Sequence, residues 1–257
     1  MTVSSECPSV VAGAPRRAGR ELLLEAVFRP AASLFVPALR RAKVPPPVVV
    51  LANAATGFVA ALALARGELV AAALLLQAKT LLDNMDGELA RAARKVTLTG
   101  RYLDTLADLA VNAALFVALG HVTGQPVLAA AAFVALTLVL AFDFNATELY
   151  REAHGLVPSS PLPTESRAER TLAATYAALL GPLDRGVRVI AARRFPQGTS
   201  YDALTMTVLA NLGLTTQLAA LGVLLVLGAP AVYLWICLAC LALLLPLQVR
   251  AERRAAK

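Results

Sequence analysis

The sequence predicts an all-α integral membrane protein with six transmembrane helices, preceded by an amphipathic helix at the membrane interface. Three observations lead to this prediction. Hydrophobic residues make up 58% of the 257 residues, charged residues only 16%, and the mean hydropathy is +0.66, whereas a soluble chain is more charged and less apolar. The apolar residues occur in blocks close to the ~20 residues that cross a bilayer core. None of these blocks alternates apolar and polar residues, as the strands of a membrane barrel do.

The six blocks are rich in Leu, Ala and Val, and glycine and proline separate them. Such segments are expected to be helical in lipid, because a helix satisfies its own backbone hydrogen bonds. The expected spans are residues 48–65, 69–82 (running on into an aspartate-rich stretch), 103–119, 127–144, 204–227 and 231–247.

Basic residues lie almost entirely on one side of this topology. They precede the first span, separate the second from the third and the fourth from the fifth, and close the chain, whereas the opposite side has only Arg66. Because basic loops stay in the cytoplasm, we expect both termini and the aspartate-rich stretch on the cytoplasmic side, in the cell inner membrane. Basic loops beside an anionic leaflet also explain the net charge of +7 without a nucleic-acid partner.

The segments outside the spans are amphipathic or basic. Before the first span, Arg residues alternate with apolar clusters, which suits an interfacial helix broken near Pro30 and Pro37. A similar pattern, interrupted at Gly181 and Pro182, follows the fourth span and predicts either a basic membrane-surface linker or a substrate lid. The expected domains are 1–47 (disordered tail and cytoplasmic interfacial helix), 48–250 (six-helix catalytic domain, with 151–202 a cytoplasmic amphipathic insertion) and 251–257 (basic cytoplasmic tail).

Four aspartates lie at the ends of the second and third expected spans. Asp83 and Asp86 share one side of the second span, and Asp104 and Asp108, four residues apart, share a stripe of the third. Four carboxylates cannot remain ionised in a small, partly dry site without cations. All-oxygen ligation indicates one or two hard divalent ions, such as Mg²⁺ or Mn²⁺. The residues therefore predict a metal-assisted reaction at a phosphate or pyrophosphate, with Arg91 available to bind a phosphate oxygen.

The aspartates could also serve as ion-pair partners or as part of a transport pathway. Lys79, four residues before Asp83, could form an ordinary ion pair with it, although one cation does not match four acids. A cation or proton transporter also needs carboxylates, but transporter sites lie near the bilayer midplane, often on broken helices. The expected position at the ends of the spans favours an enzyme.

The motif D-x2-D-G-x2-A-R-x8-G-x3-D-x3-D is similar to the signature of the CDP-alcohol phosphotransferases. This resemblance implies six transmembrane helices, commonly in a homodimer, around a polar cavity that faces the cytoplasm. It also implies that an alcohol hydroxyl attacks the β-phosphorus of a CDP-alcohol, forms a phosphodiester and releases CMP. The fixed positions of the motif are Asp83, Asp86, Gly87, Ala90, Arg91, Gly100, Asp104 and Asp108.

Carried over by position, the resemblance assigns three roles. Asp108 is the general base that accepts the proton of the attacking hydroxyl. The ligands of two Mg²⁺ or Mn²⁺ ions are Asp83, Asp86, Asp104 and Asp108. The residues that bind the nucleotide and pyrophosphate are Gly87, Ala90, Arg91, Thr97 and Gly100.

The sequence departs from the family at the start of the first span. Many members have a Pro-Asn-x-x-Thr-like stretch there that contacts the nucleotide, whereas Pro46, Pro47 and Val50 stand at these positions here. Asn53 and Thr56, one to two turns further on, are either substitutes or simple interhelical hydrogen-bonding residues.

The signature describes the donor and leaves the acceptor alcohol open. CDP-diacylglycerol is the expected donor, with glycerol phosphate, inositol or its phosphate, serine or a phosphatidylglycerol as acceptor. The alternative within the family is a CDP-choline- or CDP-ethanolamine-type enzyme that acts on diacylglycerol. Candidates for acceptor contacts, which could equally form a solvated helix end, are Asp143, Asn145, Glu148, Tyr150, Arg151, Arg193 and Arg194.

Overall fold

The computed structural model describes residues 19–92, 97–154, 166–194 and 201–255, and the regular structure within them is helical. Four helices are long and apolar enough to cross a membrane, and a bent pair with a 43° break adds a fifth span if it counts as one. The four are α2 (Pro46–Ala65), α4 (Leu98–Thr123), α5 (Pro126–Ala153) and α10 (Pro230–Ala255), and the bent pair is α8 (Ala203–Asn211) with α9 (Leu214–Val226). The predicted disordered tail falls outside the described residues.

The expected second span is α3 (Leu69–Ala92), which is long enough to cross a bilayer. It is not among the four, and its sequence gives the reason: Lys79, Asp83 and Asp86 all lie in the part that would have to cross. All six expected apolar blocks are thus helical. Among the described residues, four or five of them are long and apolar enough to cross a membrane. The predicted fifth block is divided at the break between α8 and α9.

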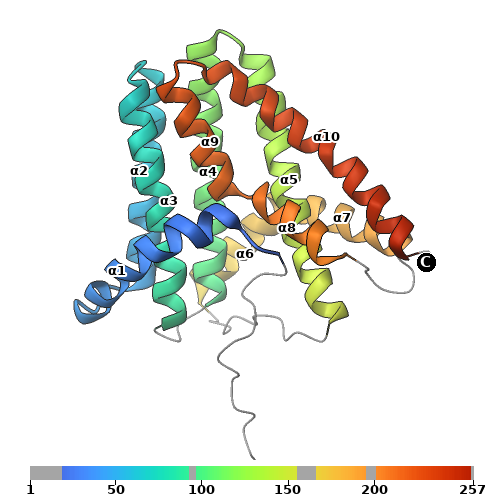
Figure 1. The fold of residues 1–257 in the computed structure, drawn as a ribbon. Helices are drawn as coiled ribbons and strands as arrows, with labels where there is room; N and C mark the ends of the chain where they lie inside the picture. The colour runs from blue at the N-terminus through green and yellow to red at the C-terminus, as the bar shows by residue number, and fades with distance from the viewer. Residues whose placement is uncertain (1–18, 93–96, 155–165, 195–200, 256–257) are drawn as a thin grey trace, which may run out of the picture.

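Glycine and proline set the tight turns at one end of the bundle. Gly67, Gly124 and Gly228 have positive φ values of 77°, 67° and 68°, a conformation that a Cβ atom disfavours. Pro126 and Pro230 then begin α5 and α10, where the missing N–H is not needed. These turns join α2 to α3, α4 to α5 and α9 to α10 at the upper end of Figure 1, so the aspartates lie toward the opposite end of α3 and α4.

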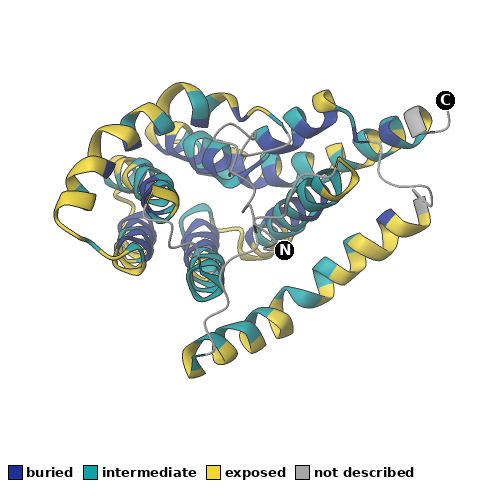
Figure 2. Ribbon diagram, turned by 90° about the horizontal axis from the view of Figure 1, so that it is seen from below, coloured by how far each residue is buried: buried dark blue, intermediate teal, exposed yellow. Residues whose placement is uncertain are grey.

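Small residues let the central helices approach closely. A Cβ atom on Gly57 of α2 would lie 2.4 Å from Cγ1 of Val111 in α4, so only glycine allows this packing. Ala60, Ala72 and Ala132 are fully buried in the main core. Figure 2 shows buried residues on the inward faces of the helices and exposed ones on the outer faces. Because many of the exposed side chains are large and apolar, the outer surface suits lipid better than water.

The N-terminal helix is continuous through Pro30 and Pro37, so the predicted breaks near both prolines are wrong. A π-helical turn, η1 (Leu24–Phe28), leads directly into α1 (Arg29–Arg41), which contains Pro37. Proline removes one backbone hydrogen bond from a helix. Ala32 and Val36 nevertheless pack with buried residues of α2 and α3, and this tertiary contact holds the helix together across the proline.

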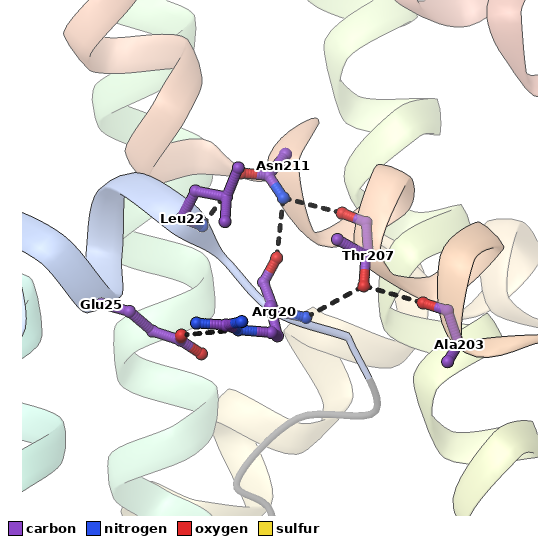
Figure 3. Close-up of polar contacts among 6 residues, drawn as sticks. All are labelled: Arg20, Leu22, Glu25, Ala203, Thr207 and Asn211. Carbon is purple, nitrogen blue, oxygen red and sulfur yellow. Dashed lines mark hydrogen bonds and ion pairs between the residues drawn. The ribbon is translucent and has the colours of Figure 1, made fainter.

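The chain just before η1 is bound to α8 (Figure 3). The Arg20 N–H donates to Thr207 Oγ1 at 3.3 Å, Asn211 Nδ2 donates to the Arg20 carbonyl at 2.7 Å, and the Leu22 N–H donates to Asn211 Oδ1 at 3.0 Å. A Cβ atom on Gly19 would lie 2.1 Å from a backbone oxygen of α8, so only glycine fits there. Among the described residues, the chain therefore contacts α8 from residue 19 onward.

The predicted insertion contains two helices, α6 (Arg167–Leu179) and α7 (Gly181–Arg194). The predicted interruption at Gly181 is confirmed, since α6 ends two residues before it. Helix α6 packs against α4 and helix α7 against α5. The expected tail after residue 250 continues α10 as a helix to Ala255.

Candidate active site

Helices α3 and α4 bring three of the four predicted aspartate ligands together. Oxygen atoms of Asp83, Asp104 and Asp108 all lie within 4.8 Å of one another. Asp104 and Asp108 are one turn apart on α4, and Asp83 reaches them from α3. Asp86, the fourth predicted ligand, is 7% exposed and lies outside this group, almost one turn further along α3.

Two carboxylate oxygens of the site are buried without a hydrogen-bond partner among the described residues. They are Oδ1 of Asp104 and Oδ2 of Asp86. An unsatisfied buried carboxylate oxygen is costly, and such atoms are rare unless a ligand or ion completes the site. The donor set is entirely oxygen, which is the chemistry that Mg²⁺ and Mn²⁺ prefer. The residues present therefore fit a divalent ion.

Lys79 belongs to the site, although the sequence did not predict this position for it. Its Nζ lies 2.6 Å from Oδ1 of Asp108, and its side chain is completely buried. The sequence suggested an ion pair between Lys79 and Asp83 on the same helix, whereas the ion pair in the structure crosses from α3 to α4. This single cation does not balance four acids. The sequence feature that could have predicted Lys79 as a site residue is its position within an expected span, one helical turn before the predicted ligand Asp83.

Of the two candidate substitutes in α2, the structure brings only Asn53 to the aspartates. The buried Asn53 side chain donates from Nδ2 to Asp83 Oδ1 at 3.3 Å. Thr56 instead donates to the carbonyl of Ala52 in its own helix at 2.8 Å. Asn53 thus links α2 to the aspartates, while Thr56 satisfies its hydroxyl locally.

The predicted nucleotide-binding residues of α3 lie in its last two turns. An added Cβ atom on Gly87 would lie 3.2 Å from Nη1 of Arg91, so the guanidinium folds back over the glycine. Ala90 lies beside Arg91 and is partly buried. A positive group therefore lies over Gly87, close in sequence to Asp86.

Thr97 and Gly100 shape the beginning of α4. Thr97 is the N-cap residue of the helix, and its Oγ1 accepts a hydrogen bond from the Gly100 N–H at 3.1 Å. An N-cap bond of this kind stabilises a helix start by about 1 kcal/mol. The structure thus gives Thr97 a capping role at the helix end that leads to Asp104.

The candidate acceptor residues on α5 are engaged mainly with neighbouring protein groups. Glu148 and Arg151 form an ion pair at 3.1 Å, and Tyr150 stacks on His154 with ring centroids 4.0 Å apart. Asn145 is buried and donates from Nδ2 to Asp184 Oδ1 in α7 at 2.8 Å. The remaining candidates are Asp143, partly buried on α5, Arg193, exposed on α7, and Arg194, whose side chain is outside the described part of the chain.

Asp184 is the centre of a polar contact that we call the α6–α7 junction, formed by Asn145, Tyr176 and Asp184. The Tyr176 hydroxyl donates to Asp184 Oδ2 at 2.7 Å, so both carboxylate oxygens accept a bond. Burial, followed by this hydrogen bond, raises the pKa of the Tyr176 hydroxyl above its usual value. The Tyr176 ring also lies 5.3 Å from that of Tyr102 in α4. The junction anchors the insertion beside the aspartate end of the bundle.

Comparison with known proteins identifies one family. No curated protein and no solved structure matches the chain significantly. A family model described as CDP-alcohol phosphatidyltransferase matches residues 43–244, a region that runs from just before α2 into α10 and contains every aspartate of the site. The chain belongs to the CDP-alcohol phosphatidyltransferase family.

Proposed function

We propose that the protein is a metal-dependent phosphotransferase of phospholipid synthesis. It transfers a substituted phosphate from a CDP-alcohol, with CDP-diacylglycerol as the donor, to an alcohol acceptor and releases CMP. Family membership supports phosphoryl transfer in lipid synthesis. The single observation that carries the proposal is the convergence of Asp83, Asp104 and Asp108 from two helices within the family region.

The proposed metal ligands are Asp83, Asp86, Asp104 and Asp108. The buried, unpartnered oxygens of Asp86 and Asp104 support this assignment, because a cation would satisfy both. Asn53 would orient Asp83 through its hydrogen bond to Oδ1. Mg²⁺ or Mn²⁺, when bound, would neutralise the pyrophosphate and stabilise CMP as the leaving group.

Asp108 is the proposed general base. The acceptor hydroxyl would give its proton to Asp108 while its oxygen forms a new bond to the β-phosphorus of the donor. The bond from that phosphorus to the bridging oxygen would break, and the bridging oxygen would leave with CMP. The Asp108 side chain is 19% exposed, so an acceptor can reach it from the open side of the site.

Small and positive residues beside the acids are proposed to hold the nucleotide. Gly87, Ala90 and Gly100 leave space next to the carboxylates, and the Arg91 guanidinium over Gly87 could bind a phosphate oxygen. Thr97, as the cap of α4, would keep Gly100 in place.

The proposal includes a membrane arrangement. We infer that α3 is the sixth span, that α1 lies in the interface and that the aspartates face the cytoplasm of the cell inner membrane. Exposed Leu34 and Phe35 on α1, close to Arg40 and Arg41, support an interfacial position. The homodimer rests on the resemblance to the family alone.

The test is an assay of CMP release. Membranes containing the protein are incubated with labelled CDP-diacylglycerol, Mg²⁺ or Mn²⁺, and a panel of alcohols. A second arm supplies CDP-choline or CDP-ethanolamine with diacylglycerol, which tests the alternative within the family. We expect CMP only when an acceptor is present. Absence of CMP with every donor and acceptor would overturn the proposal, and ion flux under the same conditions would favour a transporter.

A further inference from the structure

Arg101 lies at the beginning of α4 and has no role in the reaction proposed above. It directly follows Gly100, and its guanidinium carbon lies 4.8 Å from the centroid of the Phe144 ring in α5. The side chain therefore reaches from α4 toward α5 and rests over an aromatic ring, which holds the positive charge in place. A guanidinium in this position can still donate hydrogen bonds from its edge to a planar or tetrahedral anion.

The positive charge of Arg101 has no acid beside it in the described part of the chain. None of the described carboxylates lies within ion-pair distance of its guanidinium, and this includes Asp143 on α5 and Asp184 on α7. In contrast, the half-exposed Arg188 pairs with Glu152 at 3.4 Å. Arg101 is only partly exposed, and donors that are partly withdrawn from water normally meet an acceptor. Its N–H groups therefore suit an anionic ligand.

Arg101 and Asp108, the proposed base, share a stripe of α4. They are seven residues apart, which corresponds to about two helical turns and about 10 Å along the helix axis. The long arginine side chain and a hydrogen bond at each end bring this separation within reach of a small alcohol that carries a phosphate group. Lys79 contacts Asp108 from α3, whereas Arg101 reaches toward α5, so the two cations lie on different flanks of the stripe.

We propose that Arg101 binds a phosphate group of the acceptor and thereby places the acceptor hydroxyl at Asp108. The phosphate stays on the acceptor and only holds it, while the separate hydroxyl attacks the donor. Arginine suits this role because its planar donor group matches two oxygens of a phosphate. The acceptor is thus an alcohol that carries a phosphate, either a water-soluble phosphorylated alcohol or a phosphatidylglycerol. This inference rests on the proposed function and specifies the acceptor class.

The first test measures binding without turnover, by calorimetric titration of the purified full-length protein in detergent with Mn²⁺. The phosphate-bearing probes are glycerol 3-phosphate, inositol 1-phosphate and phosphatidylglycerol, and the uncharged matches are glycerol, inositol and diacylglycerol. Wild type is compared with Arg101→Met, which keeps the stem and removes the charge. The matched control is Arg170→Met, the same change at an exposed arginine of α6.

Wild type and Arg170→Met should bind at least one phosphate-bearing probe about tenfold or more tightly than its uncharged match. Arg101→Met should lose about 10–100-fold of that affinity, because a hydrogen bond between charged partners contributes roughly this factor. The soluble and lipid probes distinguish the two sources of the phosphate group. Equal affinity for phosphate-bearing and uncharged probes in wild type, or no effect of Arg101→Met, would overturn the inference.

A second variant keeps the test decisive if Arg101→Met does not fold. Arg101→Gln also removes the charge, and a rise in Tm with Mn²⁺ checks that the aspartate site of each variant is intact. A purely structural role of Arg101 would weaken phosphate-bearing and uncharged probes alike. The decisive readout is therefore the ratio of the two affinities, and a wild-type ratio in Arg101→Gln would overturn the inference.

CMP release then separates the acceptor from the donor. Arg101→Met should raise the KM of the phosphate-bearing acceptor about tenfold or more and leave the KM of CDP-diacylglycerol within about threefold of wild type. A rise confined to the KM of the donor would assign Arg101 to the pyrophosphate and would overturn the inference.

The two tests distinguish this inference from the proposed function. Arg101-dependent binding of a phosphate-bearing probe without CMP release from any donor would overturn only the phosphotransferase. CMP release with inositol or diacylglycerol as acceptor, unchanged in Arg101→Met, would overturn only the inference. Neither Arg101-dependent binding nor CMP release would overturn both.

Discussion

Helix α4 takes part in two polar regions that satisfy their charged groups in opposite ways. In the α6–α7 junction, which reaches α4 through Tyr102, both oxygens of Asp184 accept a hydrogen bond. In the aspartate site, Asp86 and Asp104 each keep a buried oxygen with no partner among the described residues. Both regions contact α4, but they differ in whether the protein alone completes the hydrogen bonds of the carboxylates.

This difference separates a structural region from a candidate functional one. Buried polar groups are normally paired, because leaving one unsatisfied costs about 1–3 kcal/mol. The Asp184 carboxylate follows this rule, and its two hydrogen bonds stabilise the docking of the insertion, whereas Asn145 Oδ1 is buried without a partner among the described residues. The aspartate site breaks it, which is expected where a cation and a charged substrate complete the charge balance. Four predictions test this difference, in order of decreasing effect.

The largest effect is expected at Asp108. Asp108→Asn should lower the turnover of CMP release by about 10²–10⁴-fold, since a general base contributes roughly this factor. The control is the same chemical change in the junction, Asp184→Asn, which should keep turnover within about tenfold of wild type. Equal losses in the two variants would show that the two regions do not differ in function.

Metal removal should weaken the site and leave the junction unaffected. A ligand at 100 times its Kd stabilises a folded protein by about 2.7 kcal/mol. Mn²⁺ should therefore raise the Tm of wild type and of Asp184→Ala in detergent, and a chelator should reverse the rise. Asp104→Asn should show no Mn²⁺-dependent rise. Without metal, the Asp104→Asn variant should be at least as stable as wild type, because the substitution removes a carboxylate that repels Asp83 and Asp108. A large loss of stability in metal-free Asp104→Asn would contradict a functional assignment.

Asp184→Ala should have the opposite signature. It leaves the Tyr176 hydroxyl without its acceptor and the Asn145 amide with only the Ala141 carbonyl, at an expected cost of about 1–3 kcal/mol in the free energy of unfolding. Denaturation in detergent with and without Mn²⁺ measures this loss, which should be the same in both conditions. A loss that disappears with Mn²⁺ would connect the junction to the metal site.

The smallest effect is expected for Tyr176→Phe, about 1 kcal/mol at neutral pH. The pKa of Tyr176 is raised above its usual 10.0, so the folded protein keeps this proton where the unfolded chain loses it. The stability from this hydroxyl is complete below the usual pKa and is lost progressively as the pH rises from that value toward the raised pKa of the folded protein. Unfolding measured from about pH 8 to about pH 11 should therefore show the difference between wild type and Tyr176→Phe shrinking. A constant difference would contradict a role for the protonated hydroxyl.

Relations within one helix were readily predicted from the sequence. The six apolar blocks are all helical, and the interruption at Gly181 lies where it was expected. The predicted stripe that places Asp104 and Asp108 one turn apart follows from the helical period alone. The predicted break near Pro37 was wrong because the packing of α1 on its neighbours outweighs one lost hydrogen bond.

Relations between helices needed the tertiary structure. The sequence by itself determined that the chain is helical and apolar, that four acids lie at the ends of two spans, and that a metal-assisted transfer suits them. Only the tertiary structure decided that Lys79 pairs with Asp108 across two helices, that Asn53 reaches Asp83, and that Asp86 lies outside the closest group. The helical period sets which side chains share a face, but the rotation and distance of neighbouring helices, set here by small residues such as Gly57, decide which faces meet.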